Sequence, residues 1–304
     1  MLRFLFKNIE ELKKLHYEAV LDYVKLLAAD KQNALYGNII QLSGFEGYPP
    51  LRDVADYMWL KQFILADLTT MRIWVADEAV KLKFMDFHEL YGSKFSNGVD
   101  NYVDSKNAWN AYVYIEKLGI HVCPYCDAEL LDVIDSTGKK KRISEIDHFF
   151  PEGKSKYPAL AMCFHNLVLS GQSCNGLKLQ QLLGASPYDE DIEELTFLSP
   201  DLPPGLNMES VKPEDCKVLL HAKRGMTKNE EVLGLKDRYA GRYMEAYELL
   251  KKKQSFPEEK MEEMVKAGFF ESKEQLRKAL FGEPYEATKF KMILQKMKKD
   301  LIGY

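Results

Sequence analysis

Residues His121–Gln180 decide the centre of the fold, and they read HVCPYCDAELLDVIDSTGKKKRISEIDHFFPEGKSKYPALAMCFHNLVLSGQSCNGLKLQ. Polar residues follow one another there in a fixed order, which is Cys123-x-x-Cys126, Asp147-His148, Asn166 before the apolar run Leu167–Leu169, and Cys174-Asn175-x-x-Lys178. An isolated Asp-His is usually a surface pair or a satisfied core histidine, and an asparagine before an apolar run is usually a turn residue or a cap. The order of all these elements together indicates a site that carries chemistry.

These residue types match the needs of phosphodiester hydrolysis, which requires an activated water, a neutralised phosphate and a stabilised leaving oxygen. A histidine such as His148 can take a proton from water near neutral pH. A hard divalent cation can hold the phosphate, and it prefers oxygen ligands, which Asp147 and Asn175 provide. The sequence therefore favours a metal-dependent nuclease site.

The acidic residue and the histidine are predicted to lie on one strand. If residues 142–149 form that strand, Asp147 and His148 point to opposite faces. One of them can then reach the metal while the other approaches the scissile phosphate. A second strand is expected over residues 165–170, and Asn166 at its start would hold the intervening loop and orient His148.

A helix is expected directly after the second strand. It is predicted over residues 173–183, with Asn175 in its first turn and Gly184 closing it. Leu177 and Leu182 on this helix are expected to pack back onto the strands. The predicted order is therefore strand, strand and helix, with one polar site residue or more on each.

These residues resemble the HNH, or ββα-metal, endonucleases over about sixty positions of the chain. The resemblance implies that His148 is the general base and that Asp147 and Asn175 bind a catalytic Mg²⁺ or Mn²⁺. It also implies that Asn166 orders the site. Lys178 stands where the family has the lysine of its Cys-Asn-x-x-Lys motif, which places it near phosphate, and the implied substrate is DNA.

A narrower resemblance comes from the strings CPYC, IDHFFP, YPAL, NLVLS and CN-x-x-K. They are similar to the McrA-related branch, and within it to the PtuB-type nucleases of bacterial anti-phage systems. That likeness implies a nuclease effector that works with an ATPase partner. The sequence leaves DNA and RNA, and nicking and double-strand cutting, as open alternatives.

The cysteines predict a structural zinc site. Cys123-x-x-Cys126 is typical of half a zinc knuckle, and Cys174 stands where many relatives have part of the second half. The expected partner of Cys174 is replaced by Gly171, so the fourth ligand stays open. The candidates for it are Cys163, His165 and His121.

Other interpretations remain open. The Cys-x-x-Cys pair could be redox-active, or the cysteines could be reduced thiols packed as small apolar residues. A stand-alone HNH restriction-type nuclease would need a basic recognition domain, which the sequence does not clearly contain. A zinc-bearing scaffold with a vestigial nuclease site would keep its biological activity when His148 is replaced by alanine.

Composition sets the broad class. The chain has 304 residues, 46% hydrophobic and 29% charged, which fits an ordinary globular protein. It has no apolar run long enough to cross a membrane and no signal peptide, so a cytoplasmic location is expected. Proteins that bind DNA alone usually have a basic excess, whereas the net charge here is −4. We therefore expect weak intrinsic DNA affinity, with local help from Lys139–Arg142, Lys154, Lys156 and Lys178.

The regions on either side of the motifs are predicted to be helical. Asn8 with Glu11 forms a capping-box pattern before an apolar stripe that contains His16, which we expect to be a core residue. From Glu214 onward the chain is expected to be helical again, after a loop-rich stretch that contains a short strand near 193–198.

The predicted class is α+β, a mainly α-helical chain with a small central ββα-metal (HNH) module. Three regions follow from the pattern. They are a helical region over residues 1–118, the HNH module with its zinc-knuckle-like cysteines over 119–185, and a loop followed by helices over 186–304.

Overall fold

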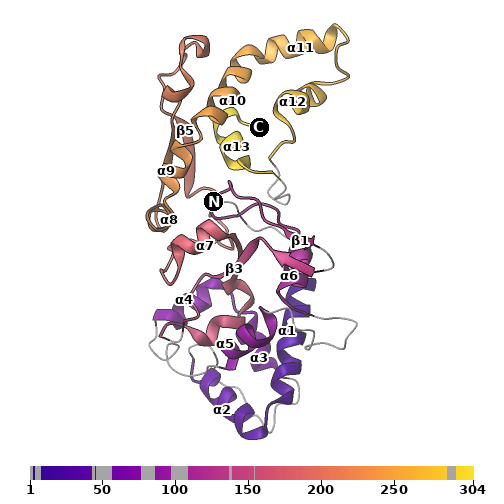
Figure 1. The fold of residues 1–304 in the computed structure, drawn as a ribbon, viewed down its shortest axis with the longest axis vertical. Coiled ribbons are helices and arrows are strands. Elements are labelled where there is room, and N and C mark those ends of the chain that lie inside the picture. The colour runs from indigo at the N-terminus through magenta and orange to yellow at the C-terminus, as the bar shows by residue number, and fades with distance from the viewer. Residues whose placement is uncertain are drawn as a thin grey trace.

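The computed structural model describes residues 3, 8–42, 45, 57–76, 86–96, 109–136, 139–153, 155–285 and 292–304. Within them the fold is α+β, as predicted, with many helices and small antiparallel sheets of two strands each. Figure 1 shows an elongated molecule with the N-terminal helices at one end, the C-terminal helices at the other, and β1 and β3 between them.

The N-terminal helices form because apolar residues recur at helical spacing. Their bounds are α1 Ile9–Leu26, α2 Ala29–Ile40, α3 Met58–Ile64, α4 Leu68–Ala76, α5 Asp86–Leu90 and α6 Ala111–Leu118, with a π-helical turn at Tyr91–Phe95. Asn8 is the N-cap of α1, but its side chain makes no capping hydrogen bond, so the predicted capping box is not formed. Asn110 does cap α6, by accepting from the amides of Tyr112 and Val113.

His16 lies on the buried face of α1, as predicted, and is fully buried. Its Nδ1 accepts a hydrogen bond of 3.1 Å from Trp109 Nε1. The other ring nitrogen, Nε2, therefore carries the proton and donates to the carbonyl of Met162 at 2.7 Å. This neutral histidine ties α1 to the loop that lies between the two central strands.

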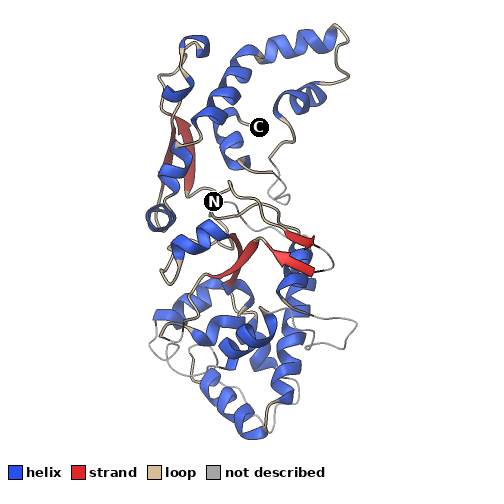
Figure 2. Cartoon of the chain, in the orientation of Figure 1, coloured by secondary structure: helices blue, strands red, loops and turns tan. Residues whose placement is uncertain are grey.

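The central strands are shorter than predicted. They are β1 Val133–Ser136, β2 Lys139–Arg142, β3 Ser144–His148 and β4 Leu167–Gly171, and Figure 2 shows β1–β2 and β3–β4 as separate ribbons. The strand expected over 142–149 is confirmed as β3 but begins later, because Arg142 pairs with β1 and the chain changes partner at Ile143 to pair with β4. In the β3–β4 ribbon, Asp147 lies opposite Val168 and His148 lies opposite Leu167.

Helix α7 (Gln172–Lys178) follows β4 at once, as predicted, but it ends earlier than residue 183. Leu179 has a φ of +47°, which no longer allows helix to continue. Leu177 and Leu182 are 45% and 42% exposed, so the expectation that they pack onto the strands is wrong. The buried residues of the helix are Cys174 and Lys178 instead, and the helix contacts β3 and β4.

The C-terminal region begins with a β-ribbon. Strand β5 (Thr196–Pro200) pairs with β6 (Val218–Ala222). The helical structure expected from Glu214 onward therefore begins only at Met226, and the prediction is wrong for the residues of β6. The helices that follow are α8 Met226–Leu233, α9 Leu235–Ala240, α10 Tyr243–Ser255, α11 Glu258–Lys266, α12 Lys273–Phe281 and α13 Gln295–Ile302.

Both flanking regions contact the centre. On the N-terminal side, the Cys163 thiol donates to the carbonyl of Phe63 at 3.5 Å. On the C-terminal side, the Tyr239 hydroxyl donates to the carbonyl of Cys126 at 2.9 Å. A single cluster of buried apolar residues extends from Leu12 to Leu301. In the described ranges, none of the helices has the length and apolar character needed to span a membrane.

The burial of His16 predicts a pH dependence of stability. Burial lowers the pKa of His16 from 6.5 to about 4. The unfolded chain therefore binds this proton at a higher pH than the folded chain, and stability is lost as pH falls from about 6.5 toward 4. The loss amounts to about 1.4 kcal/mol for each pH unit in that window.

We therefore expect the wild type to lose more free energy of unfolding than His16→Gln between pH 7 and pH 5. Urea unfolding at several pH values measures both proteins. Equal losses in the two would contradict the assignment of His16 as a buried neutral histidine.

Candidate functional site

The arrangement of β3, β4 and α7 places the predicted site residues on adjoining elements. Asp147 and His148 end β3, Asn166 directly precedes β4, and Asn175 and Lys178 lie on α7. Successive side chains on a strand point to opposite faces, which sends Asp147 toward α7 and His148 toward the loop between the strands. The site is therefore divided by β3.

Asp147 is almost fully buried, at 3% exposure, and both of its oxygens are engaged. Oδ2 accepts a hydrogen bond of 2.6 Å from the hydroxyl of Tyr125. Oδ1 accepts from the ammonium of Lys178 at 2.9 Å. Tyr125, the tyrosine of the CPYC string, is a site residue that the sequence analysis missed.

Lys178 is fully buried and lies inside the site rather than at its surface. Besides Asp147, its Nζ donates to the carbonyl of His148 at 2.6 Å. The expected position of Lys178 beside a phosphate therefore differs from the observed one, because a buried ammonium pairs with the nearest buried carboxylate. A divalent cation on Asp147 requires this ammonium to move, since two cations at one carboxylate repel each other.

Asn175 is half-buried on α7, three residues before Lys178. Residues three apart share a helix face, so Asn175 lies on the side from which Lys178 reaches Asp147. The two oxygen-bearing side chains predicted to share a catalytic cation are thus on facing elements. Their donor chemistry fits Mg²⁺ or Mn²⁺, and the Lys178 ammonium occupies one oxygen of Asp147.

His148 is 6% exposed and sits against the edge of the Tyr91 ring, with ring centroids 4.4 Å apart. Its Nε2 donates to the carbonyl of Ala161 at 3.0 Å, so the lone pair is on Nδ1. Burial lowers the pKa of His148 to about 3, which keeps the ring neutral but makes it a weak base as long as it stays buried.

An acidic residue lies near the free nitrogen of His148. Glu152 Oε1 is 3.7 Å from His148 Nδ1, and Oε2 is 3.1 Å from Nδ1 of His88. Burial raises the pKa of the Glu152 carboxyl. Tyr91, His88 and Glu152 were not found from the sequence, because two of them lie on distant helical turns and Glu152 stands in a loop with no regular period.

Asn166 holds the loop between β3 and β4. Its Oδ1 accepts from the amide of Phe150 at 2.7 Å, and its Nδ2 donates to the carbonyls of Phe150 and Leu160 at 3.1 and 2.9 Å. These bonds close the loop as expected. Asn166 acts on His148 only through this backbone, because Leu160 is next to Ala161, the residue that accepts from His148.

Three buried cysteines form a separate cluster that includes the first turn of α7. The sulfurs of Cys123, Cys126 and Cys174 lie within 4.8 Å of one another, and the group could hold a metal ion. All three are free thiols. Hydrogen bonds from the thiols of Cys123 and Cys174 lower the pKa of Cys126 to about 3, which favours the thiolate form of this sulfur. Thiolate sulfur is the form that ligates a metal.

The residues named as candidates for a fourth ligand do not join this cluster. Cys163 bonds to the carbonyl of Phe63, and Nδ1 of His165 bonds to the carbonyl of Ala66 at 2.7 Å. His121 lines another cavity, beside α6. Each of these three candidates is therefore excluded in the observed arrangement, because its side chain serves a different part of the core or surface.

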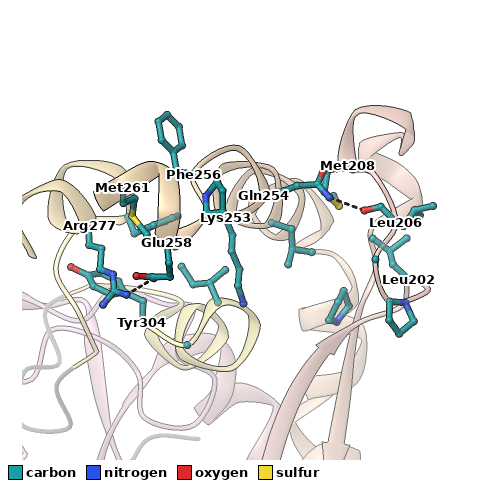
Figure 3. A pocket seen from close by; sticks show the side chains of 18 of the residues that line it. Leu202, Leu206, Met208, Lys253, Gln254, Phe256, Glu258, Met261, Arg277 and Tyr304 are labelled. Atoms are coloured by element: carbon teal, nitrogen blue, oxygen red, sulfur yellow. Dashed lines mark hydrogen bonds and ion pairs between the residues drawn. The ribbon is translucent and has the colours of Figure 1, made fainter. Parts of the chain in front are cut away.

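A cavity of about 830 Å³ lies away from these residues, between the β5 end and helices α10–α12. Figure 3 shows its wall, which is mainly apolar and includes Leu202, Met208 and Met261. Its cationic Arg277 is paired with Glu258. The cavity contains none of the predicted site residues.

Of the basic residues expected around the site, the structure describes the surroundings of Arg142 and Lys156 but not of Lys154. Arg142 stacks over the ring of Tyr112, with 5.4 Å from its guanidinium carbon to the ring centroid. Lys156 is half-buried, and Lys154 lies outside the described residues. No protein-family model, curated protein or solved structure matches the chain.

The buried ion pair predicts a strong coupling between two residues. Lys178→Met leaves the Asp147 carboxylate buried without its cation, which should cost about 3–5 kcal/mol of unfolding free energy. Adding Asp147→Asn removes that unpaired charge, so the double variant should lose at least about 1 kcal/mol less than the sum of the single variants.

Urea unfolding of the four proteins measures this cycle. Lys296→Met is a matched control, because Lys296 is another buried lysine with its own partner, Asp300. Its loss should simply add to that of Asp147→Asn. Additive losses for the Asp147–Lys178 pair itself would contradict the coupling.

Proposed function

We propose that the chain is a metal-dependent endonuclease of the HNH type. The observation that carries the proposal is the position of Asp147 and His148 at the end of β3, with α7 following β4. Asp147 points toward α7, the helix that carries Asn175, and the neutral imidazole of His148 lies on the opposite face of the strand. The reaction class is hydrolysis of DNA phosphodiester bonds.

In this proposal each residue has one role. Asp147 and Asn175 hold a Mg²⁺ or Mn²⁺ ion, which when bound neutralises the phosphate and stabilises the leaving oxygen. His148 takes the proton of the attacking water at Nδ1, because Nε2 already donates to Ala161. Asn166 keeps the loop that carries this carbonyl in place.

The cysteine cluster is assigned a structural role. We assign Zn²⁺ to Cys123, Cys126 and Cys174, because closed, sulfur-rich sites suit zinc and the three sulfurs are buried. The cluster includes the residue directly before Asn175, so a bound ion would fix the start of α7 and with it the position of the amide.

A partner protein completes the proposal. The net charge of −4 gives the chain little general attraction for DNA, and we therefore propose that another molecule helps it to bind. Its resemblance to PtuB-type nucleases makes an ATPase of an anti-phage system the partner we propose. The isolated chain should then bind DNA weakly at physiological salt.

A zinc-bearing scaffold with an inactive nuclease site is the second candidate. Two observations favour it: the Lys178 ammonium forms an ion pair with Asp147, and His148 is only 6% exposed. A substrate would have to open both sides of β3 before reaction. The scaffold differs from the nuclease in needing neither side chain for its biological effect.

A plasmid-cleavage assay distinguishes the two candidates. The purified chain is incubated with supercoiled DNA and Mg²⁺ or Mn²⁺, beside His148→Ala and Asn175→Ala. Loss of the general base should lower the rate by about 10²–10⁴-fold. Asn175→Ala should raise the metal concentration needed for cutting, because it removes an oxygen ligand.

His165→Ala is the matched control, because His165 is also a mostly buried histidine bonded to a carbonyl, and it lies outside the proposed site. It should cut at the wild-type rate. Equal cutting by wild type and His148→Ala would refute the role of His148. A wild type that does not cut with either cation would favour the scaffold.

A further inference from the structure

The space left by the missing cysteine of the knuckle is occupied by a carboxyl group. Gly171 stands where the second half of a zinc knuckle would carry its first cysteine. A Cβ atom at Gly171 would lie 2.1 Å from the carboxyl carbon of Glu129, and 2.2 and 2.6 Å from its oxygens. Even the first atom of a side chain at 171 would therefore clash with Glu129.

Glu129 reaches this place from the ribbon that carries the knuckle. Val122 and Leu130 form a bridge, and the amide of Cys123 donates to the carbonyl of Glu129 at 2.9 Å. Cys123 and Glu129 are thus directly opposite each other. Residues paired in this way point to the same face, so the carboxylate and the Cys123 sulfur leave the ribbon together.

The carboxylate ends beside the third cysteine. It accepts from the amide of Ser173 at 3.3 Å and forms a short hydrogen bond with the Ser173 hydroxyl. Ser173 directly precedes Cys174 in α7. Glu129 therefore links the segment that carries Cys123 to the residue before Cys174, while its carboxylate lies outside the group of three sulfurs that are within 4.8 Å of one another.

A positive charge lies on the same side. Arg238 of α9 donates to the Cys174 sulfur at 3.1 Å and to the Ser173 hydroxyl at 2.6 Å. A guanidinium has no lone pair to give a metal, so Arg238 cannot be the fourth ligand. It can offset the negative charge that three thiolates and one carboxylate leave around a divalent ion.

A surface cavity lies beside Cys126 and Glu129. A cavity of about 440 Å³ is lined by Cys126, Glu129, Ser173, Asp237 and Arg238, among others. A metal ion can approach the sulfurs through it. The carboxyl groups on this wall are those of Glu129 and Asp237, and Glu129 is the one that stands in the place of residue 171.

We propose that Glu129 is the fourth protein ligand of a zinc site formed with Cys123, Cys126 and Cys174. On binding, the cysteine thiols release their protons to solvent, and the Glu129 side chain leaves Ser173 and turns toward the sulfurs to bond the ion. Carboxylate oxygen is an accepted zinc ligand beside cysteine sulfur. The proposal rests on the zinc assignment made above, and it is independent of nuclease activity.

The test measures zinc directly. Purified wild-type chain is analysed for zinc by mass spectrometry and then titrated with a chelator, beside Glu129→Gln and the double variant Glu129→Ala/Gly171→Cys. Losing a ligand should weaken zinc binding by more than about tenfold, because losing only an outer-shell partner already costs about 10–100-fold. The double variant should regain tight binding, since the cysteine introduced at position 171 would be free of the clash and would supply sulfur.

Asp237→Ala is the matched control, because it removes the other carboxylate on the cavity wall, and it should leave zinc affinity unchanged. Replacing zinc by Co²⁺ adds a second readout that does not depend on folding alone. The sulfur-to-cobalt charge-transfer band should be stronger in the double variant than in the wild type, because a fourth thiolate has replaced oxygen.

The outcomes distinguish the existence of a zinc site from the assignment of Glu129 as its fourth ligand. Wild-type affinity in Glu129→Gln, or a loss in Asp237→Ala alone, would overturn the assignment of Glu129 while leaving a zinc site. A wild-type chain that binds no zinc would overturn both. Circular dichroism of Glu129→Gln, which keeps the size of the side chain, shows whether the variant is folded.

Discussion

The ion pair between Lys178 and Asp147 organises the centre of the molecule. It is buried on both sides, and the same ammonium also holds the carbonyl of His148. Taking two charges out of water is costly, so such a pair persists only where further hydrogen bonds satisfy it. Tyr125 provides one of them by donating to the second oxygen of Asp147. The last turn of α7, the end of β3 and the CPYC segment are therefore fixed at one point.

The same pair sets the chemical state of the site. An ammonium can stand in for a divalent cation at a carboxylate, because both neutralise the buried negative charge. The Lys178 ammonium thus balances the buried charge on the Asp147 side of β3. On the other side, His148 is neutral, with its free nitrogen facing Glu152. In the proposed nuclease, binding of a cation to Asp147 requires a displacement of Lys178, and binding of the proposed substrate or partner would supply the free energy for it.

Much of this arrangement was predictable, and the reason is that its signals are local. The order of strand, strand and helix follows from Asp147-His148, Asn166 and Cys174-Asn175, which lie within a short stretch of chain. The end of α7 was not predictable in the same way. Its last turn stops at Leu179, a non-glycine residue with positive φ, which has no signature in composition.

The contacts that were missed connect residues far apart in the chain. Tyr91 against His148, and Arg238 on Cys174, join segments whose own patterns are those of ordinary helices. The replacement of a cysteine at 171 by the carboxyl of Glu129 is a further case. Gly171 signals only that a ligand is absent, whereas the compensating residue becomes visible once Cys123 and Glu129 are seen to face each other.

The knuckle is also the place where the C-terminal region is attached. Asp127 has a φ of +53°, and this conformation turns its carbonyl toward the amide of Leu294, at 2.5 Å. Its side chain accepts from the amide of Lys296 at 2.6 Å and so satisfies a free N–H in the first turn of α13.

A metal held by the neighbouring Cys126 would therefore stiffen the support of α13 as well as the start of α7. Arg238 adds a second link, from α9 to the sulfur of Cys174. The cysteine cluster thus connects the helix that carries Asn175 with the helices of the C-terminal region. Asn229 of α8 provides another link, because its side chain accepts from the amides of Gly184 and Ala185, a few residues after α7.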